Sequence, residues 1–142
     1  LDKILNEEVM IKKKSILGIC LGYQIMLMKS EENKKVEGLG WIDGEVKKFK
    51  KTKKFSVPHV GWNKIKFEKI NLMTNIPNDS RLYFDHSYYT EINNKNLKYG
   101  ITNHGTNFKS IYANKNIFGC QPHPEKSQKF GLQILKNFCE LC

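Results

Sequence analysis

A cysteine framed by glycines is the residue whose surroundings most directly suggest chemistry. Cys20 lies within Gly18-Ile19-Cys20-Leu21-Gly22, which has the Gly-x-nucleophile-x-Gly form of a nucleophile elbow. In this cramped turn from strand to helix, small flanking residues avoid clashes and the nucleophile is pushed into the open. The backbone N–H of Leu21 would act as an oxyanion donor, and the start of the helix would lower the thiol pKa. The pentapeptide alone is also compatible with a buried cysteine beside two turn glycines.

A base and a carboxylate that could serve this cysteine occur together near the C-terminus. A cysteine nucleophile needs a base, and the base needs a group that orients it. The segment Gln121-Pro122-His123-Pro124-Glu125 supplies both, since prolines restrict the backbone around His123 and residues two apart in an extended segment face the same side. A lone histidine is more often structural, so the prediction rests on the pair of motifs. We predict a Cys20–His123–Glu125 triad in which the thiol and the imidazole meet within hydrogen-bonding reach.

The elements that position the cysteine follow from the apolar pattern. A short apolar run over residues 15–19 predicts a buried strand, and apolar residues at helical spacing predict a helix over residues 21–29. A polar loop over residues 30–35 and a glycine-rich turn around residues 38–40 come next. The passage from strand to helix therefore falls at Cys20.

The rest of the chain alternates strand-like runs with polar or glycine-containing breaks. Strands are predicted at residues 45–49, 63–67, 81–84, 98–103, 108–113 and 117–121. A final amphipathic helix is predicted over residues 127–140, with Ser127 as its N-cap. Because no repeat or linker divides the chain, we expect one unit over residues 1–142.

The formal net charge of +10 raises the question of nucleic acid. Nearly all of the positive charge is lysine, and Arg81 is the only arginine, whereas bidentate recognition of guanine favours arginine. The densest run, residues 47–54, contains six lysines and is expected in a solvated hairpin. We therefore expect no nucleic-acid partner, and an acidic protein would make better use of the charge.

Cysteine spacing and hydropathy show whether to expect a metal site, a membrane span or a signal peptide. The four cysteines are scattered, and Cys139-Glu-Leu-Cys142 has the spacing of a redox or zinc pair without the second pair that a four-ligand site needs, so we expect no metal. No apolar run reaches the roughly 20 residues that span a bilayer, and residues 1–14 lack the apolar core of a signal peptide. We expect a cytoplasmic protein that does not enter a membrane.

Several segments together resemble a known family. Residues 18–24 and 122–126 are similar to the two signatures of class I glutamine amidotransferases. Four further segments narrow the resemblance to the glutaminase subunit of imidazole glycerol phosphate synthase, namely residues 30–32, 38–40, 57–63 and 83–89. These motifs occur in the family's order, from about residue 15 to the C-terminus.

The resemblance implies a fold, a reaction and a pocket. The fold would be α/β and flavodoxin-like with a central mixed sheet, and no cofactor would be needed. Cys20 would attack the side-chain amide of glutamine, His123 would protonate the leaving ammonia, and water would release glutamate from the thioester. The residues implied to bind the substrate are Leu21, Gln24, Glu32, Ser87 and Tyr88.

The resemblance also implies a partner. Ammonia in this family passes to a (β/α)₈ barrel subunit, in a heterodimer that serves histidine biosynthesis. The loop over residues 58–63, including Trp62, and Lys126 would lie toward that barrel. A core aromatic is the alternative for Trp62. His59 and His86 are expected to be structural or interface residues rather than second bases.

The match departs from the family in three places. The family's domain begins with two or three strands before the elbow, whereas only fourteen residues precede Ser15. We therefore expect a partial, N-terminally truncated domain that lacks its first strands and a glycine-rich loop, whose oxyanion donor is typically worth roughly 10²–10³ in rate. Pro122 stands where the family usually has an aromatic residue, and Asp85 stands where it usually has an apolar one.

Three interpretations stay open from the sequence, and the first is favoured. The chain is a glutaminase subunit of histidine biosynthesis, a similar subunit that feeds ammonia to a barrel amidating surface sugars, or an inactive fragment that only binds the barrel. A nucleic-acid-binding module is a distant fourth. The oligomeric state and the ammonia acceptor do not follow from the sequence.

Overall fold

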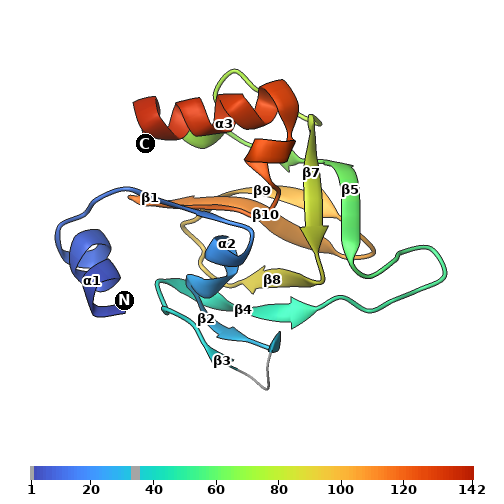
Figure 1. The fold of residues 1–142 in the computed structure, drawn as a ribbon, viewed down its shortest axis with the longest axis horizontal. Coiled ribbons are helices and arrows are strands. Elements are labelled where there is room, and N and C mark those ends of the chain that lie inside the picture. The colour runs from blue at the N-terminus through green and yellow to red at the C-terminus, as the bar shows by residue number, and fades with distance from the viewer. Residues whose placement is uncertain (1, 33–35) are drawn as a thin grey trace.

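The centre of the fold is a five-stranded mixed sheet. The structure, a computed structural model, describes residues 2–32 and 36–142. Strands β1 and β11 pair in parallel, and the remaining neighbours pair antiparallel (Figure 1). In sheet order the strands are β1 (Ile16–Ile19), β11 (Ile117–Cys120), β10 (Asn107–Asn114), β9 (Lys98–Asn103) and β6 (Lys66–Phe67). The predicted mixed sheet is confirmed, and β1 forms one edge of it within the described residues.

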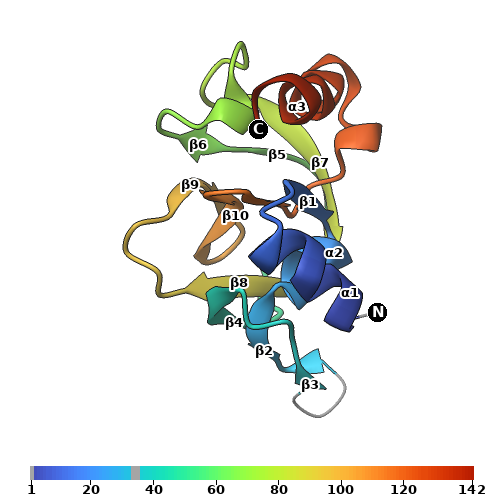
Figure 2. The same ribbon diagram turned by 90° about the vertical axis from the view of Figure 1, so that its left-hand side faces the viewer.

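Two smaller sheets complete the strands. One has the order β3 (Val36–Glu37), β2 (Leu27–Ser30), β4 (Ile42–Lys48) and β8 (Tyr88–Ile92), and the other pairs β5 (His59–Lys64) with β7 (Arg81–His86). In Figure 2, β9, β10 and β1 lie between the β5–β7 pair and the four-stranded sheet. Only Ser87 separates β7 from β8, so the chain passes there from one small sheet to the other.

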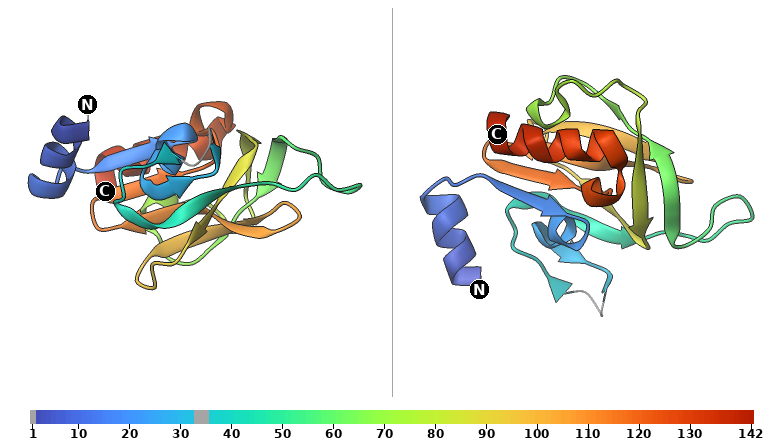
Figure 3. Two further views of the ribbon diagram at one scale, coloured as in Figure 1. Left: turned by 90° about the horizontal axis from the view of Figure 1, so that it is seen from below. Right: turned by 45° about the horizontal axis from the view of Figure 1, so that its top comes forward.

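The C-terminal helix α3 (Gln128–Leu141) covers one side of the five-stranded sheet (Figures 1 and 3). Within α3, Ile134 is fully buried, and the ring of Phe138 meets the ring of Phe118 edge-on with 5.9 Å between the ring centres. The buried amide of Asn137 donates to the carbonyl oxygens of Leu72 and Thr74, which ties α3 to the 3-10 turn Asn71–Met73. This helix lies within one residue of the prediction at each end.

The N-terminal residues form helical structure that the sequence did not predict. Helix α1 (Asp2–Asn6) continues into a π-helical turn (Glu7–Ile11). The Trp41 indole donates to the side chain of Asn6 at 2.7 Å, and Val9 is buried in the smaller of the two hydrophobic clusters. The segment is therefore packed against the fold that follows it.

The helix predicted over residues 21–29 was too long. Helix α2 spans only Leu21–Ile25, and β2 begins at Leu27. Leu27 is fully buried and pairs with Ile42 of β4, while the N–H of Ile42 donates to the carbonyl of Met26. Pairing with β4 satisfies the backbone and buries Leu27, so tertiary contacts override the helical spacing.

Three other predictions need correction. The predicted loop over residues 58–63 is mostly strand β5, and β8 was not predicted at all. The lysine-rich run of residues 47–54 is not a hairpin, because β4 ends at Lys48 and the chain then crosses to β5 in a different sheet. Residues 33–35 of the predicted polar loop lie outside the described residues.

Candidate active site

Cys20 occupies the strained turn that the glycine pattern predicted. It follows β1 directly and precedes α2, with φ 50° and ψ −104°, a conformation that non-glycine residues rarely adopt. A Cβ atom added at Gly18 would lie 2.5 Å from the carbonyl oxygen of Gly22, so the turn requires glycine at position 18. The nucleophile elbow predicted from the sequence is therefore present in the backbone.

The parallel pairing of β1 with β11 brings the two sequence motifs to one edge of the sheet. Ile19 lies opposite Cys120, so Cys20 and the segment that follows β11 leave the sheet side by side. The N–H of Cys20 donates to the carbonyl of Cys120 at 2.9 Å. Residues separated by most of the chain thus share one small region, as the triad prediction requires.

His123 is oriented by the carboxylate that the sequence assigned to it. Its Nδ1 lies 2.7 Å from Oε1 of Glu125, and its backbone N–H donates to the carbonyl of Tyr83. Burial raises the pKa of Glu125, but hydrogen bonds from its own N–H and from His123 outweigh it, so the pKa is lowered overall. Since an ionised carboxylate only accepts, Nδ1 carries the hydrogen and Nε2 is left to accept a proton.

The sulfur of Cys20 contacts groups from two distant parts of the chain. It lies 3.9 Å from the carbonyl oxygen of Asp85 and 3.9 Å from the side-chain nitrogen of Gln121. Among the described residues, no hydrogen bond joins the sulfur to His123. The direct contact between thiol and imidazole therefore stays a prediction.

The expectation that the turn lowers the thiol pKa was wrong. Burial raises the pKa of Cys20 and is the largest influence; the N–H of Leu21 opposes it, and the charges of Asp85 and Glu125 raise it further. Helix α2 has only five residues, so little of a helix dipole is available to offset burial. A thiol with a raised pKa is protonated near neutral pH and needs a base before it can attack.

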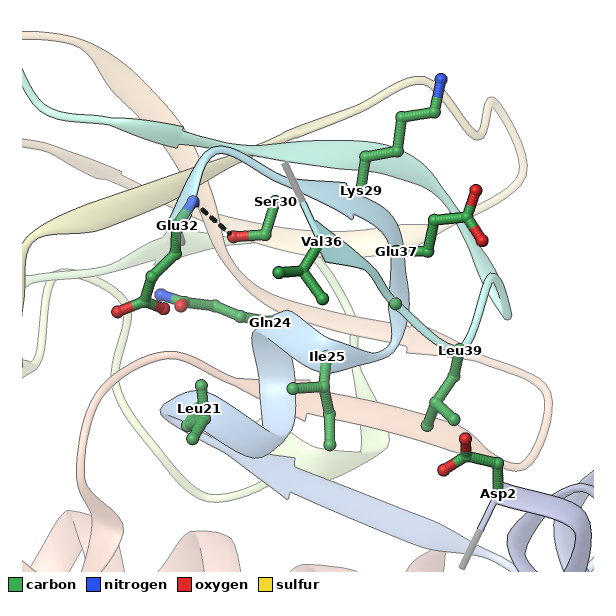
Figure 4. A pocket seen from close by; sticks show the side chains of 11 residues that line it. Asp2, Leu21, Gln24, Ile25, Lys29, Ser30, Glu32, Val36, Glu37 and Leu39 are labelled. Carbon is green, nitrogen blue, oxygen red and sulfur yellow. Dashed lines mark hydrogen bonds between the residues drawn. The ribbon is translucent and has the colours of Figure 1, made fainter. Parts of the chain in front are cut away.

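Three of the five predicted substrate residues line one cavity. Leu21, Gln24 and Glu32 surround a space of about 330 Å³, together with apolar side chains of α2 and β3 (Figure 4). Ser87 and Tyr88 are not among the described residues that line it. The Tyr88 carbonyl nevertheless accepts a hydrogen bond from Gln24 Nε2 at 3.2 Å. Gln24 therefore links the cavity to the segment that holds Ser87 and Tyr88.

The two predicted interface residues both contact the half-buried ring of Tyr83. The Trp62 side chain is 43% exposed and contacts the ring of Tyr83 edge-on at 6.0 Å. The Lys126 ammonium lies 5.6 Å from the centre of the same ring. Trp62 is therefore not a core aromatic, and it lies near Lys126, which directly follows the His-Pro-Glu segment.

His59 and His86 lie in a buried aromatic cluster, as their predicted structural role requires. His59 Nδ1 lies 2.9 Å from His86 Nε2, and the His59 ring stacks on Phe84 and His104. Burial is the main reason why the pKa of His59 falls to about 3 and that of His86 to about 4. Both rings are thus neutral near pH 7. Gln121, which contacts the sulfur of Cys20, was given no role from the sequence.

Comparison with known proteins decides the family. The profile of the family described as "Glutamine amidotransferase class-I" matches residues 2–142. The chain belongs to the class I glutamine amidotransferases. The nucleophile elbow and the His-Pro-Glu segment are thus found in a chain of the family that they suggested.

Named relatives of this amidotransferase cover nearly all of the chain. It is 43% identical over 136 residues to imidazole glycerol phosphate synthase subunit HisH 2 of Methanococcus maripaludis, covering 95% of this chain and 67% of that protein. It is 48% identical over 130 residues to the HisH subunit of Buchnera aphidicola, covering 91% of this chain and 65% of that protein. The chain thus spans about two thirds of the length of these relatives.

Solved structures support the fold of a class I amidotransferase. A crystal structure of a glutamine amidotransferase aligns with TM-score 0.68 at 11% identity, covering 97% of this chain and 68% of that one. A glutamine amidotransferase of Thermotoga maritima aligns with TM-score 0.61 at 15% identity, covering 98% of this chain and 52% of that one. At these identities the likeness concerns the fold alone.

Metal-ligand groups and membrane-spanning helices are both missing from the described residues. Within residues 2–32 and 36–142, no His, Cys, Asp and Glu side chains form a group that could hold a metal ion. No helix in the described part of the amidotransferase is long and apolar enough to cross a bilayer. All four cysteines, including Cys139 and Cys142, are free.

Proposed function

We propose that this chain is the glutaminase component of imidazole glycerol phosphate synthase and supplies ammonia for histidine biosynthesis. The observation that carries the proposal is the meeting of the Cys20 elbow and the His123–Glu125 pair at one edge of the sheet. The relatives named as HisH subunits support the pathway. A cytoplasmic location remains a prediction from the sequence.

In the proposed reaction, His123 Nε2 takes the thiol proton of Cys20 as the sulfur attacks the side-chain carbonyl carbon of glutamine. The oxyanion that forms would accept a hydrogen bond from the N–H of Leu21, which already lies close enough to favour the thiolate. His123 then gives its proton to the departing nitrogen. The nitrogen departs as ammonia, and the acyl group stays on Cys20 as a thioester. Water, deprotonated by His123, attacks the thioester to release glutamate and restore the thiol.

The substrate would occupy the cavity beside α2. Glu32 supplies a carboxylate that can pair with the ammonium group of glutamine, and Gln24 supplies an amide from α2 (Figure 4). Both amide hydrogens of Gln24 are already directed to protein acceptors, so its carbonyl oxygen is the atom left for the ligand. Ser87 and Tyr88 would complete the pocket from the β7–β8 junction.

The ammonia would pass to a (β/α)₈ barrel partner bound over Trp62 and Lys126. An exposed tryptophan beside a lysine and a tyrosine is the kind of surface that anchors protein interfaces. This surface adjoins the catalytic segment, since Lys126 follows Glu125 directly. A short path from the thioester to the partner is therefore geometrically reasonable.

The test is glutamate release from glutamine, measured with and without the barrel subunit. We expect release that depends on the barrel and is lost in Cys20→Ala. Release by Cys20→Ala equal to that of the parent would overturn the proposal. Binding of the barrel without any glutamate release would favour the interpretation in which the chain only binds its partner.

A second experiment separates the two pathways left open by the sequence. Growth of a histidine auxotroph carrying the gene would support histidine biosynthesis. Failure to grow, in a strain where the protein accumulates and releases glutamate, would favour a barrel that amidates surface sugars.

A further inference from the structure

Gln121 is a fully buried polar residue to which the proposed mechanism gives no role. It follows β11 directly, and its backbone N–H donates to the carbonyl of Ser110 at 2.8 Å. A buried amide is costly unless its polar atoms are hydrogen-bonded. The side-chain oxygen of Gln121 accepts from Gln24 at 2.8 Å, and its nitrogen lies 3.9 Å from the sulfur of Cys20.

The direction of these hydrogen bonds is fixed by a backbone carbonyl. The carbonyl oxygen of Tyr88 can only accept, so the group that Gln24 turns toward it must be the amide nitrogen. The same nitrogen then donates its second hydrogen to Gln121, which must present its oxygen on that side. The nitrogen of Gln121 is therefore turned toward Cys20, which makes it a donor to the sulfur.

The acceptor at the start of this chain is itself held in place. Nδ1 of His86 lies 2.6 Å from the Tyr88 carbonyl oxygen, and the buried His59 lies against the other nitrogen of that ring. A hydrogen-bonded series thus runs from the histidine cluster through Tyr88 and Gln24 to Gln121. Each member orients the next, so the amide beside the sulfur has little freedom to rotate.

We propose that Gln121 is a positioning residue for the nucleophile, whose side-chain amide holds the Cys20 sulfur at the edge of the sheet from which the His123 segment departs. The inference rests on the proposed function, because it assigns Cys20 as the nucleophile. Gln121 stands two residues before His123 in the same segment. One short stretch of chain therefore fixes both the sulfur and its base.

The donor also favours the charged form of the sulfur. A hydrogen bond given to a thiolate stabilises it relative to the thiol. Burial and the charges of Asp85 and Glu125 act in the opposite direction on Cys20. Gln121 is thus placed to stabilise the thiolate that forms when the base removes the proton.

Two substitutions separate the donor role from the acceptor role. Gln121→Met has similar length and removes both polar atoms, whereas Gln121→Glu keeps an acceptor for Gln24 but loses the donor to sulfur. The matched control is Asn137→Leu, since Asn137 is also a buried amide, with three side-chain hydrogen bonds, but serves α3 and not Cys20. Tm is recorded for every variant, so that loss of folding is seen directly.

The decisive readout is alkylation of Cys20 by iodoacetamide as a function of pH. The tryptic peptide of residues 15–29 contains Cys20 as its only cysteine, so mass spectrometry isolates the signal from the other three. We expect the midpoint of the profile to rise by about half to one pH unit in Gln121→Met and at least as much in Gln121→Glu. With the barrel present, kcat for glutamate release should fall about tenfold while KM changes less than about threefold.

A parent-like alkylation profile and kcat in both folded variants would overturn the inference, and so would an equal shift in Asn137→Leu. If neither variant at position 121 folds, Gln24→Met becomes the test. It removes the hydrogen bond that orients the Gln121 amide, so the midpoint of the Cys20 alkylation profile should also rise. An unchanged midpoint there counts against the inference. If the parent chain releases no glutamate, the proposed function fails. The alkylation measurement still tests the role of Gln121, because alkylation of Cys20 needs no glutamine.

Discussion

The chain has four histidines, and they occupy two contrasting regions. His59, His86 and His104 lie among the rings of Phe49 and Phe108, away from any carboxylate that hydrogen-bonds them within the described residues. His123 instead lies at the end of β11 with Glu125 against its Nδ1. In the first region burial keeps the rings of His59 and His86 neutral, and in the second one imidazole is partly exposed beside a carboxylate.

The difference teaches that surroundings, not residue type, decide what a histidine does here. A proton placed on His59 or His86 would be desolvated and would face neighbouring imidazoles. His123 instead has the carboxylate of Glu125 against its Nδ1, which orients the ring. The second environment is the one that the proposed base requires.

The largest expected effect is the loss of the base. His123→Ala should lower kcat for glutamate release at least about 10³-fold, because His123 is the proposed base for the thiol of Cys20. His104→Ala is the comparison, since it removes a half-buried ring from the other cluster and should leave kcat within about threefold. The assay is glutamate release with the barrel present. A small effect at His123, or an equal effect at His104, would break the contrast.

The second prediction concerns stability below neutral pH. His59 and His86 have folded pKa values of about 3 and about 4, below the value near 6.5 of an unfolded histidine. Between these pH values the unfolded chain binds more protons than the folded chain. The free energy of unfolding is therefore highest above about pH 6.5 and decreases as pH falls. We expect a loss of about 3 kcal/mol between pH 7 and pH 5, measured by urea unfolding.

The matched control for this titration is His59→Gln, which keeps a hydrogen-bonding side chain but cannot be protonated. Its stability should fall with decreasing pH about half as steeply as that of the parent, because one of the two depressed titrations is gone. A variant that loses stability as steeply as the parent would show that other groups are responsible.

The third prediction tests the carboxylate that sets His123 apart. Glu125→Gln keeps an acceptor for Nδ1 but removes the charge, and kcat should fall about 10²-fold with little change in Tm. Glu140→Gln, an exposed glutamate near the end of α3, is the control and should behave as the parent. An unaltered kcat in Glu125→Gln would mean that the ring needs no charged partner.

The smallest expected effect is at the surface beside the catalytic segment. Trp62→Ala should weaken binding of the barrel subunit by about 2 kcal/mol, as truncation of an interface anchor does, while Tm changes little. The control is Leu132→Ala, which removes another exposed apolar side chain from the outer face of α3. Isothermal titration with the barrel measures both. Equal affinities for Trp62→Ala and the parent would remove this residue from the proposed interface.

The sequence predicted most of the central sheet and much of the candidate site. Strand β9 lies at the predicted residues, and β1, β10, β11 and α3 lie within one residue of their predicted ends. These elements have clear apolar patterns bounded by polar breaks. Strands β2 and β8 were missed because both are ordered by pairing with β4, a contact that no local pattern reveals.

The same limit applies within the site. Gly18, Cys20 and the His-Pro-Glu segment are local motifs, so their types and spacing were enough to predict the strained turn at Cys20 and the contact between His123 and Glu125. The raised pKa of Cys20 was not predicted, since it depends on burial and on charges contributed from other elements. Gln121 was passed over because a glutamine beside a histidine carries no signal until its amide is seen against the sulfur.

By itself, the sequence determined which residues are candidates for the chemistry, because a strained turn needs glycine and a thiol nucleophile needs a base with a carboxylate behind it. Tertiary structure alone decided that the two motifs leave the sheet side by side and that His59 and His86 are neutral. Parallel pairing of β1 with β11 carries the two motifs to one edge, and the aromatic cluster removes His59 and His86 from water. Both outcomes depend on long-range packing, which sets distances and solvation that spacing along the chain does not encode.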